Sequence, residues 1–213
     1  MSLKENLTKI KDQIRETENE TKNPGKVKLI AVTKTRDFQT INKAYECGVT
    51  SIGENRVQEA ESKFESFQNM PTLEKRFIGH LQSNKVKRCL ALFDTIDSVN
   101  SLKIAKKINN HLTQENRKIK SLLEVNMSGD EQKQGFSPEN IDDLILAISL
   151  EPLGVEGLMT IGPVSRNEKE TRKAFSDLRK LKEKLNKEIK KESLIELSMG
   201  MSGDFKIGIQ EGS

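Results

Sequence analysis

One lysine, Lys34, follows an apolar run and is the residue whose position most clearly suggests chemistry. The run is Leu29–Val32 in the segment KLIAVTKT. Side chains alternate along a strand, so Lys34 shares a face with Val32 and Ile30. If those two fill the interior of a barrel, Lys34 emerges at its C-terminal mouth. There its uncharged amine could form a Schiff base with a carbonyl. The alternative is a lysine that covers a strand end while its amine stays in water.

Polar turns follow several other apolar segments and supply candidate ligand groups. Asn55 in IGENRVQEA could bind a ligand or start the next helix, and capping is the commoner role of such a residue. FIGHLQSNK offers His80 and the amides of Gln82 and Asn84. In VNMSGDEQKQGF, Lys133 could reach a phosphate or lie in solvent. Each of these signals is weak by itself.

The segment ELSMGMSGDF suggests an anion site more directly. Ser198, Gly200, Ser202 and Gly203 precede a short expected helix, an arrangement that aims hydroxyl and N–H groups at an anion. Barrel phosphate sites commonly lie after strands seven and eight beside a short extra helix. A Gly/Ser turn that binds nothing fits the spacing equally well.

Helices and strands must position these turns. The period of the hydrophobic pattern switches repeatedly along the chain, as expected where helices and strands follow one another. Helical spacing predicts an N-terminal helix over about 2–20 and further helices over 38–47, 57–67, 84–93, 100–112, 138–149, 167–191 and 204–212. Strands are predicted over 27–34, 50–54, 76–80, 94–99, 119–127, 153–162 and 193–200. Pro138 suits the first turn of the sixth helix of that series.

Alternating strands and helices without a linker predict one α/β domain, 1–213, with a parallel sheet. The pattern favours a TIM-type (β/α)8 barrel. An open doubly wound sheet is the alternative. No eighth strand is found before Ser213, and 213 residues is short against the ~250 typical of the barrel fold.

Composition excludes several classes of protein. The 36 basic and 32 acidic residues are interleaved, which argues against nucleic-acid binding. Two cysteines and two histidines, far apart in sequence, argue against a metal site, a disulfide scaffold or a histidine-based triad. Neither a signal peptide nor a membrane-length apolar run is found, so we expect a cytoplasmic protein. Scarce aromatic residues, 4 %, predict an aliphatic core.

Taken in order, seven segments give a stronger signal than any one of them. They are AVTKT, IGENRVQE, FIGHLQSNK, TIDSVNS, EVNMSGDEQKQGF, GLMTIG and ELSMGMSGDF. This series closely resembles the pyridoxal phosphate homeostasis protein family, which is similar to the alanine racemase N-terminal domain. The resemblance covers nearly the whole chain apart from the first helix.

The resemblance implies a barrel that binds pyridoxal 5′-phosphate (PLP), held as a Schiff base on Lys34. It implies that Asn55 lies near the cofactor ring and that Ser198 and Ser202 lie at the phosphate. Family members are regarded as non-catalytic proteins that bind, buffer and deliver PLP, with PLP-dependent apoenzymes as possible recipients. The long helix at 167–191 has one apolar face only, so we expect a monomer.

Two other functions stay open, and one departure from the family matters. The alternatives are a PLP-dependent amino-acid racemase and a binding module for another phosphorylated ligand or for nucleic acid. The family normally continues beyond this point with an eighth strand that carries an R-x-G segment. If the chain stops at Ser213, cofactor affinity and stability should both suffer.

Overall fold

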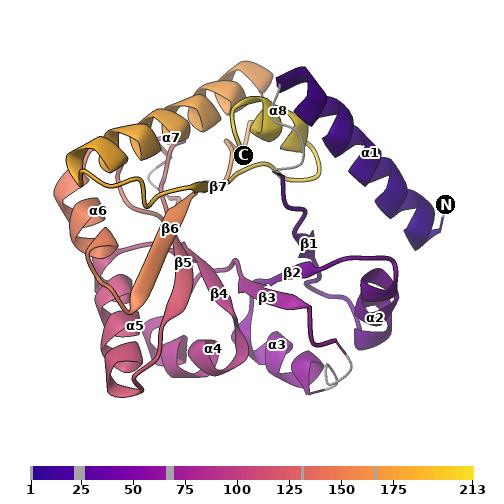
Figure 1. Ribbon diagram of the computed structural model, residues 1–213, viewed down its shortest axis with the longest axis horizontal. Helices are drawn as coiled ribbons and strands as arrows, with labels where there is room; N and C mark the ends of the chain where they lie inside the picture. Colours follow the sequence, from indigo (N-terminus) through magenta and orange to yellow (C-terminus); the bar gives the residue numbers. More distant parts are fainter. Residues whose placement is uncertain (1, 22–26, 66–69, 131, 166) are drawn as a thin grey trace.

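The computed structural model describes residues 2–21, 27–65, 70–130, 132–165 and 167–213. In this described part, seven strands form one sheet in which neighbours are parallel and follow chain order. The strands are β1 (Ala31–Val32), β2 (Ser51–Glu54), β3 (Glu74–Phe77), β4 (Thr95–Val99), β5 (Ile119–Glu124), β6 (Leu153–Met159) and β7 (Glu196–Ser198). The sheet curls round on itself into a partial barrel (Figure 1).

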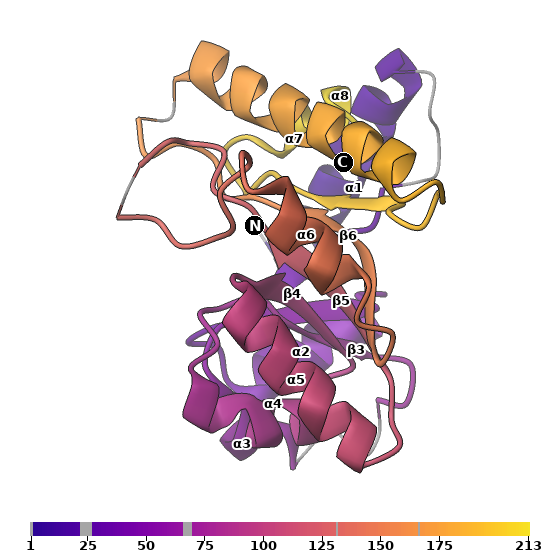
Figure 2. The same ribbon diagram turned by 90° about the vertical axis from the view of Figure 1, so that its left-hand side faces the viewer.

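Helices cover the outside of this curled sheet (Figures 1 and 2). They are α1 (Leu3–Thr21), α2 (Phe38–Glu46), α3 (Val57–Phe64), α4 (Val86–Leu92), α5 (Leu102–Gln114), α6 (Ile141–Ile148), α7 (Glu168–Glu188) and α8 (Phe205–Gln210), with a 3-10 turn η2 (Ser83–Lys85) before α4. Helix α1 contacts α8 between the two edge strands, β1 and β7. A doubly wound sheet reverses its strand order at a switch point, so strands in chain order confirm the barrel-type prediction.

Many element boundaries differ by a few residues from the sequence prediction, and two of these differences lie at the first strand and the sixth helix. The strand predicted over 27–34 is regular only at Ala31–Val32. The helix predicted over 138–149 begins at Ile141, because Asn140 Oδ1 accepts the N–H of Asp143 and caps it there. Pro138 therefore precedes the helix and does not lie in its first turn.

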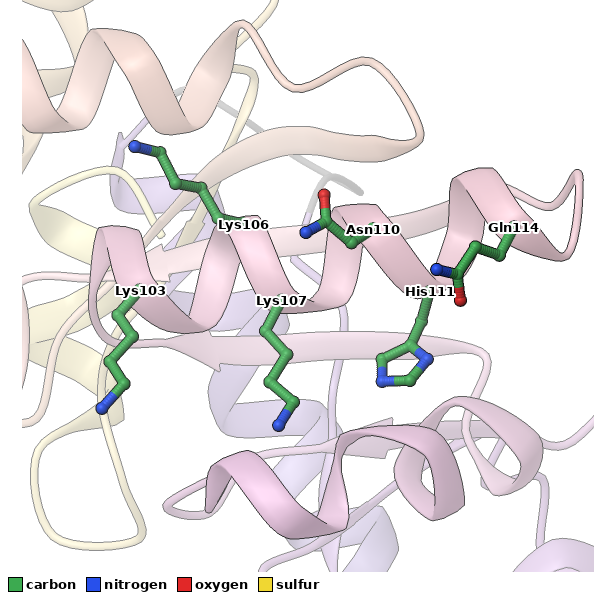
Figure 3. A pocket seen from close by; sticks show the side chains of 6 residues that line it. All are labelled: Lys103, Lys106, Lys107, Asn110, His111 and Gln114. Carbon is green, nitrogen blue, oxygen red and sulfur yellow. The ribbon is translucent and has the colours of Figure 1, made fainter.

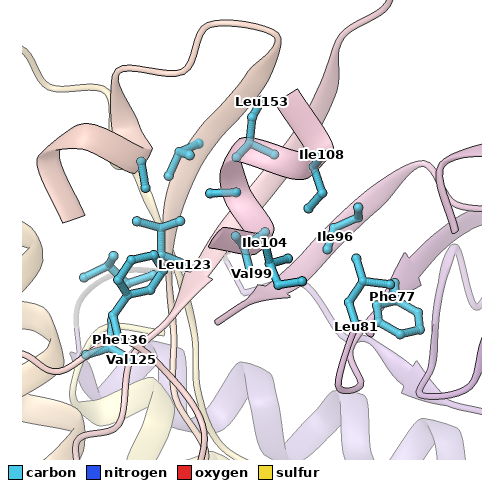
Figure 4. Close-up of a cluster of buried hydrophobic side chains, with 14 of the residues drawn as sticks. Phe77, Leu81, Ile96, Val99, Ile104, Ile108, Leu123, Val125, Phe136 and Leu153 are labelled. Atoms are coloured by element: carbon cyan, nitrogen blue, oxygen red, sulfur yellow. The ribbon is translucent and has the colours of Figure 1, made fainter. Parts of the chain in front are cut away.

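The main core lies between the outer face of the sheet and the helices (Figure 4). Buried aliphatic side chains such as Ile96, Leu123 and Ile108 dominate it, as predicted. Phe77 and Phe93 add an edge-to-face contact with ring centroids 5.2 Å apart. Each fully buried Leu, Ile or Phe side chain contributes about 1.5–3 kcal/mol, so this layer fixes the strands that carry the mouth.

The opposite face of the sheet is polar toward the amino ends of the strands. Arg76 of β3 is buried and donates from Nε to Asp97 Oδ2 of β4 at 2.7 Å. Its Nη2 reaches Glu196 Oε2 of β7 at 3.2 Å. Thr95 Oγ1 donates to Asp97 Oδ1 at 3.0 Å. Strands β3, β4 and β7 are thus linked through one guanidinium.

Candidate functional site

Lys34 lies in a tight turn at the carboxyl end of β1. Arg36 N–H donates to Thr33 O at 3.0 Å, which places Lys34 and Thr35 in the two central positions. Thr35 has a φ of +63°, a left-handed conformation that β-branched residues rarely adopt. Lys34 is exposed, and no hydrogen bond or ion pair of its amine is found in the described part of the chain. The structure therefore presents an exposed amine on a strained turn.

Alternation along β1 decides which side of the sheet the residues before Lys34 face. Thr33 is buried on the helix side, where its Oγ1 donates to Glu54 Oε1 at 2.6 Å. Its neighbour Val32 in β1 consequently faces inward, and the turn that carries Lys34 follows directly after Thr33. Val32 is 50 % exposed, so it does not fill the interior as the sequence suggested. The physical reason is that β1 is an edge strand, with β2 as its one neighbour in the described sheet.

Asn55 follows β2, the strand beside β1. Its Oδ1 is buried and has no hydrogen-bond partner among the described residues. It does not cap α3, whose N-cap is Arg56 without a side-chain hydrogen bond. A Cβ on Gly79 would lie 2.1 Å from Asn55 O, so a glycine is needed for the turn after β3 to approach it. Asn55 therefore does not cap the next helix, and its carboxamide oxygen is a buried hydrogen-bond acceptor.

The turns after β3, β4 and β5 are joined by hydrogen bonds at the same end of the sheet. Asn100 Nδ2 lies 3.0 Å from His80 Nδ1 and donates to Gln134 Oε1 at 2.5 Å. The sequence pointed to His80 but missed Asn100 and Gln134. The position of Asn100 directly after the strand TIDSV is the signal that could have identified it. Lys133 donates to Gly162 O at 2.7 Å and so binds the turn after β6.

The two predicted phosphate ligands lie at the end of β7 and in the loop that follows it. Ser198 is partly buried and Ser202 is exposed. Gly200 has a φ of +99°, and a Cβ there would lie 2.8 Å from Phe205 Cα at the start of α8. Met201 N–H already donates to Asp204 Oδ1 at 2.5 Å. The N–H groups of Gly200, Ser202 and Gly203 have no partner within the described ranges.

A shallow depression lies away from these turns, on the outer face of α5 (Figure 3). Its lining is Lys103, Lys106, Lys107, Asn110, His111 and Gln114. These side chains come from one solvent-facing helix surface, and strand-end turns do not contribute to it. Within the described ranges, no group of three or more His, Cys, Asp or Glu side chains could hold a metal ion, and no helix is long and apolar enough to cross a membrane.

Comparison with known proteins identifies the family. The model of the alanine racemase N-terminal domain matches residues 6–210. A pyridoxal phosphate homeostasis protein of Aquifex aeolicus (strain VF5) is 36 % identical over 100 % of this chain and 93 % of its own length. One from Pasteurella multocida (strain Pm70) is 35 % identical with the same coverage. The chain belongs to the pyridoxal phosphate homeostasis protein family.

Solved structures agree with this assignment to the pyridoxal phosphate homeostasis protein family. PipY of Synechococcus elongatus PCC7942, solved without PLP, is 32 % identical with a TM-score of 0.90, covering 100 % of this chain and 95 % of PipY. PipY with PLP bound gives a TM-score of 0.83, and the comparison covers 94 % of each chain. An alanine racemase of Clostridium difficile 630 is 22 % identical with a TM-score of 0.70 and is covered over 54 % of its length, a likeness of fold alone.

Proposed function

We propose that this member of the pyridoxal phosphate homeostasis protein family binds PLP at the carboxyl ends of its strands and holds it as a Schiff base on Lys34. Two observations carry the proposal: the exposed amine of Lys34 at the carboxyl end of β1, and the buried Oδ1 of Asn55 at the end of the neighbouring strand β2, neither of which has a partner among the described residues. In the condensation, the uncharged Nζ attacks the aldehyde carbon, a C=N bond forms and one water molecule leaves. Neither an oxidant nor a reductant is needed.

The remaining mouth residues fit the other parts of the cofactor. Asn55 Oδ1 is an acceptor for which the described residues supply no donor, and a ligand group at the mouth would supply one. The hydroxyls of Ser198 and Ser202 suit a phosphate, as do the N–H groups of the loop after β7 that have no partner among the described residues. The proposal therefore assigns Lys34 to the aldehyde, Asn55 to the ring and the two serines to the phosphate.

We further propose that the protein stores and delivers PLP in the cytoplasm and does not turn over a substrate. An incoming amine, including the lysine of a PLP-dependent apoenzyme, can replace Lys34 Nζ at the same carbon without net consumption of water. The names of the curated relatives and the two states of PipY, with and without PLP, support this role. A monomer suffices for it.

An amino-acid racemase is the second candidate, favoured by the fold shared with alanine racemase. Racemisation through a planar carbanion needs acid–base groups on both faces of the α-carbon. Lys34 could serve one face, and the other candidate is His80, which lies in the turn after β3 with its Nδ1 3.0 Å from Asn100 Nδ2. Exchange of the α-proton in D2O that is lost in both Lys34→Ala and His80→Asn would favour the racemase.

A spectroscopic titration with PLP tests the binding role. We expect the wild-type protein and the control Lys103→Ala, which removes an exposed α5 lysine, to develop a Schiff-base absorption band at the same PLP concentration. Lys34→Ala should develop none at that concentration. Bands of equal size in all three proteins would contradict the assignment of Lys34.

A further inference from the structure

The turn that carries Lys34 is held from the helix side by side chains that the binding role does not use. Thr33 O, which closes the turn by accepting Arg36 N–H, also accepts Lys63 Nζ at 2.9 Å. On the other side of Lys34, Thr35 N–H donates to Glu59 Oε1 at 2.5 Å. The peptide groups before and after Lys34 are both fixed by α3.

Lys63 sits at the centre of this arrangement. Its Nζ donates to Glu54 Oε1 at 2.9 Å, to Glu59 Oε1 at 2.7 Å and to Thr33 O, which uses all three ammonium hydrogens. Thr33 Oγ1 donates to the same Glu54 oxygen at 2.6 Å. The side chain of Lys63 is 10 % exposed and that of Glu54 0 %. We call Glu54, Glu59 and Lys63 the clamp.

The protonation states of Lys63 and Glu59 are secured by their contacts within the clamp. Burial alone would lower the pKa of Lys63, but its hydrogen bonds to Glu59 and Glu54 outweigh burial and raise that pKa. The hydrogen bond from Lys63 and that from Thr35 lower the pKa of Glu59. Lys63 and Glu59 therefore stay ionised at neutral pH, and their contacts to the turn persist there.

Three unfavourable features coincide at this turn. A buried ion pair such as Lys63–Glu54 gives little net stability, because desolvation offsets the attraction. Glu54 Oε2 is buried and has no partner among the described residues. Thr35 is held at a φ of +63°. Strain and unsatisfied groups persist where the surrounding contacts over-determine a conformation, commonly at functional sites.

We propose that Glu54, Glu59 and Lys63 are positioning residues that fix the backbone on both sides of Lys34 and so aim its amine into the mouth. This inference rests on the proposed function, since Lys34 must be the residue that reacts. The clamp contributes no atom to the new C=N bond. It restricts the turn to one conformation, and orientation of a nucleophile accelerates its attack.

Glu59→Ala is the decisive variant, because it frees Thr35 N–H and leaves Lys63 paired with Glu54. Lys63→Met would instead leave Glu54 buried without a cation and threaten folding. Glu61→Ala is the matched control: it lies on the same helix, but its carboxylate pairs with Arg88 at the surface. Glu59→Gln keeps an acceptor for Thr35 and serves as the conservative rescue.

Two readouts are compared: the rate constant for Schiff-base formation with PLP, mapped to Lys34, and the hydrogen exchange of the Thr35 amide without PLP. In Glu59→Ala we expect the rate to fall about tenfold and the exchange to accelerate about tenfold. Glu61→Ala should stay within about twofold for both readouts. Glu59→Gln should recover most of the rate.

The possible failures are distinguishable. If wild-type adduct maps to Lys34 but Glu59→Ala reacts at the wild-type rate, the positioning role is overturned and the proposed function stands, whether or not amide exchange changes. The positioning role is likewise overturned if Glu61→Ala is slowed as much as Glu59→Ala. If wild-type adduct maps to other lysines, the proposed function is overturned and the positioning role with it.

Discussion

The carboxamide oxygen of Asn55 is buried without a partner among the described residues, so its removal should affect ligand binding more than folding. Removing an unsatisfied acceptor does not remove a native hydrogen bond, so Asn55→Ala should change the free energy of unfolding by less than about 1 kcal/mol without PLP. Loss of one ligand hydrogen bond should weaken PLP binding about tenfold. Urea unfolding and PLP titration of the same preparation measure the two effects. Equal PLP affinity of variant and wild type would contradict the role of Asn55.

Glu124 is the last residue of β5 and faces the inner side of the sheet. Its neighbours Leu123 and Val125 are both buried in the outer core, so alternation turns its side chain to the inner side. Burial raises the pKa of Glu124 to about 7. The unfolded chain titrates near 4.5, so the folded state loses stability as the pH rises from about 4.5 through about 7.

Glu124→Gln removes this titration while keeping the shape of the side chain. At pH 8 we expect the variant to unfold with a free energy up to about 3 kcal/mol higher than the wild type, and at pH 4 with nearly the same value. Urea unfolding at the two pH values measures the difference. Glu139→Gln, which alters an exposed carboxylate, is the control. A pH-independent effect of Glu124→Gln would contradict the burial argument.

At the scale of elements, Arg76 joins three strands of the polar inner face. Asp97, which it contacts, has a side chain that is 0 % exposed, and hydrogen bonding to Asp97 outweighs burial in raising the pKa of Arg76. Arg76→Met would leave this carboxylate buried without its cation and should cost about 3–5 kcal/mol of unfolding free energy. The exposed pair Arg88–Glu61 is the control, and Arg88→Met should cost less than about 1 kcal/mol.

Urea unfolding at pH 7 measures both variants, and the double variant Arg76→Met, Asp97→Asn sharpens the test. Because asparagine carries no charge, the double variant should be more stable than Arg76→Met alone. A loss in Arg76→Met no larger than that in Arg88→Met would show that this link does not hold β3, β4 and β7 together.

The sequence predicted the order of elements far better than their contacts. The change of hydrophobic period identifies the seven strands and the eight α-helices of the described residues, because it reflects burial on one face. The clamp could not be predicted in this way: Glu59 and Lys63 are four residues apart on a helix, a spacing more typical of a surface ion pair. Nor does the local sequence show that Asn100 and Gln134 meet, since tertiary packing of separate turns decides it.

At the scale of the whole molecule, a ligand bound at the carboxyl ends of the strands should raise the stability of the folded protein. The mouth draws residues from the ends of strands β1 to β7, so PLP should stabilise the folded state as a unit. At 100 times its dissociation constant, a ligand adds about 2.7 kcal/mol. For a chain of this size we expect a rise in Tm of about 5–10 °C. Calorimetry of wild type and Lys34→Ala measures it, and an equal rise in both would contradict the covalent assignment.

Borohydride reduction of the PLP-treated protein, followed by peptide mass mapping, tests the central claim most directly. Reduction converts a Schiff base into a stable secondary amine, so the modified lysine can be identified. The proposed function predicts a single pyridoxyl group on Lys34 in the wild type and none there in Lys34→Ala. Label spread over surface lysines such as Lys103 and Lys106, with Lys34 unmodified, would contradict it.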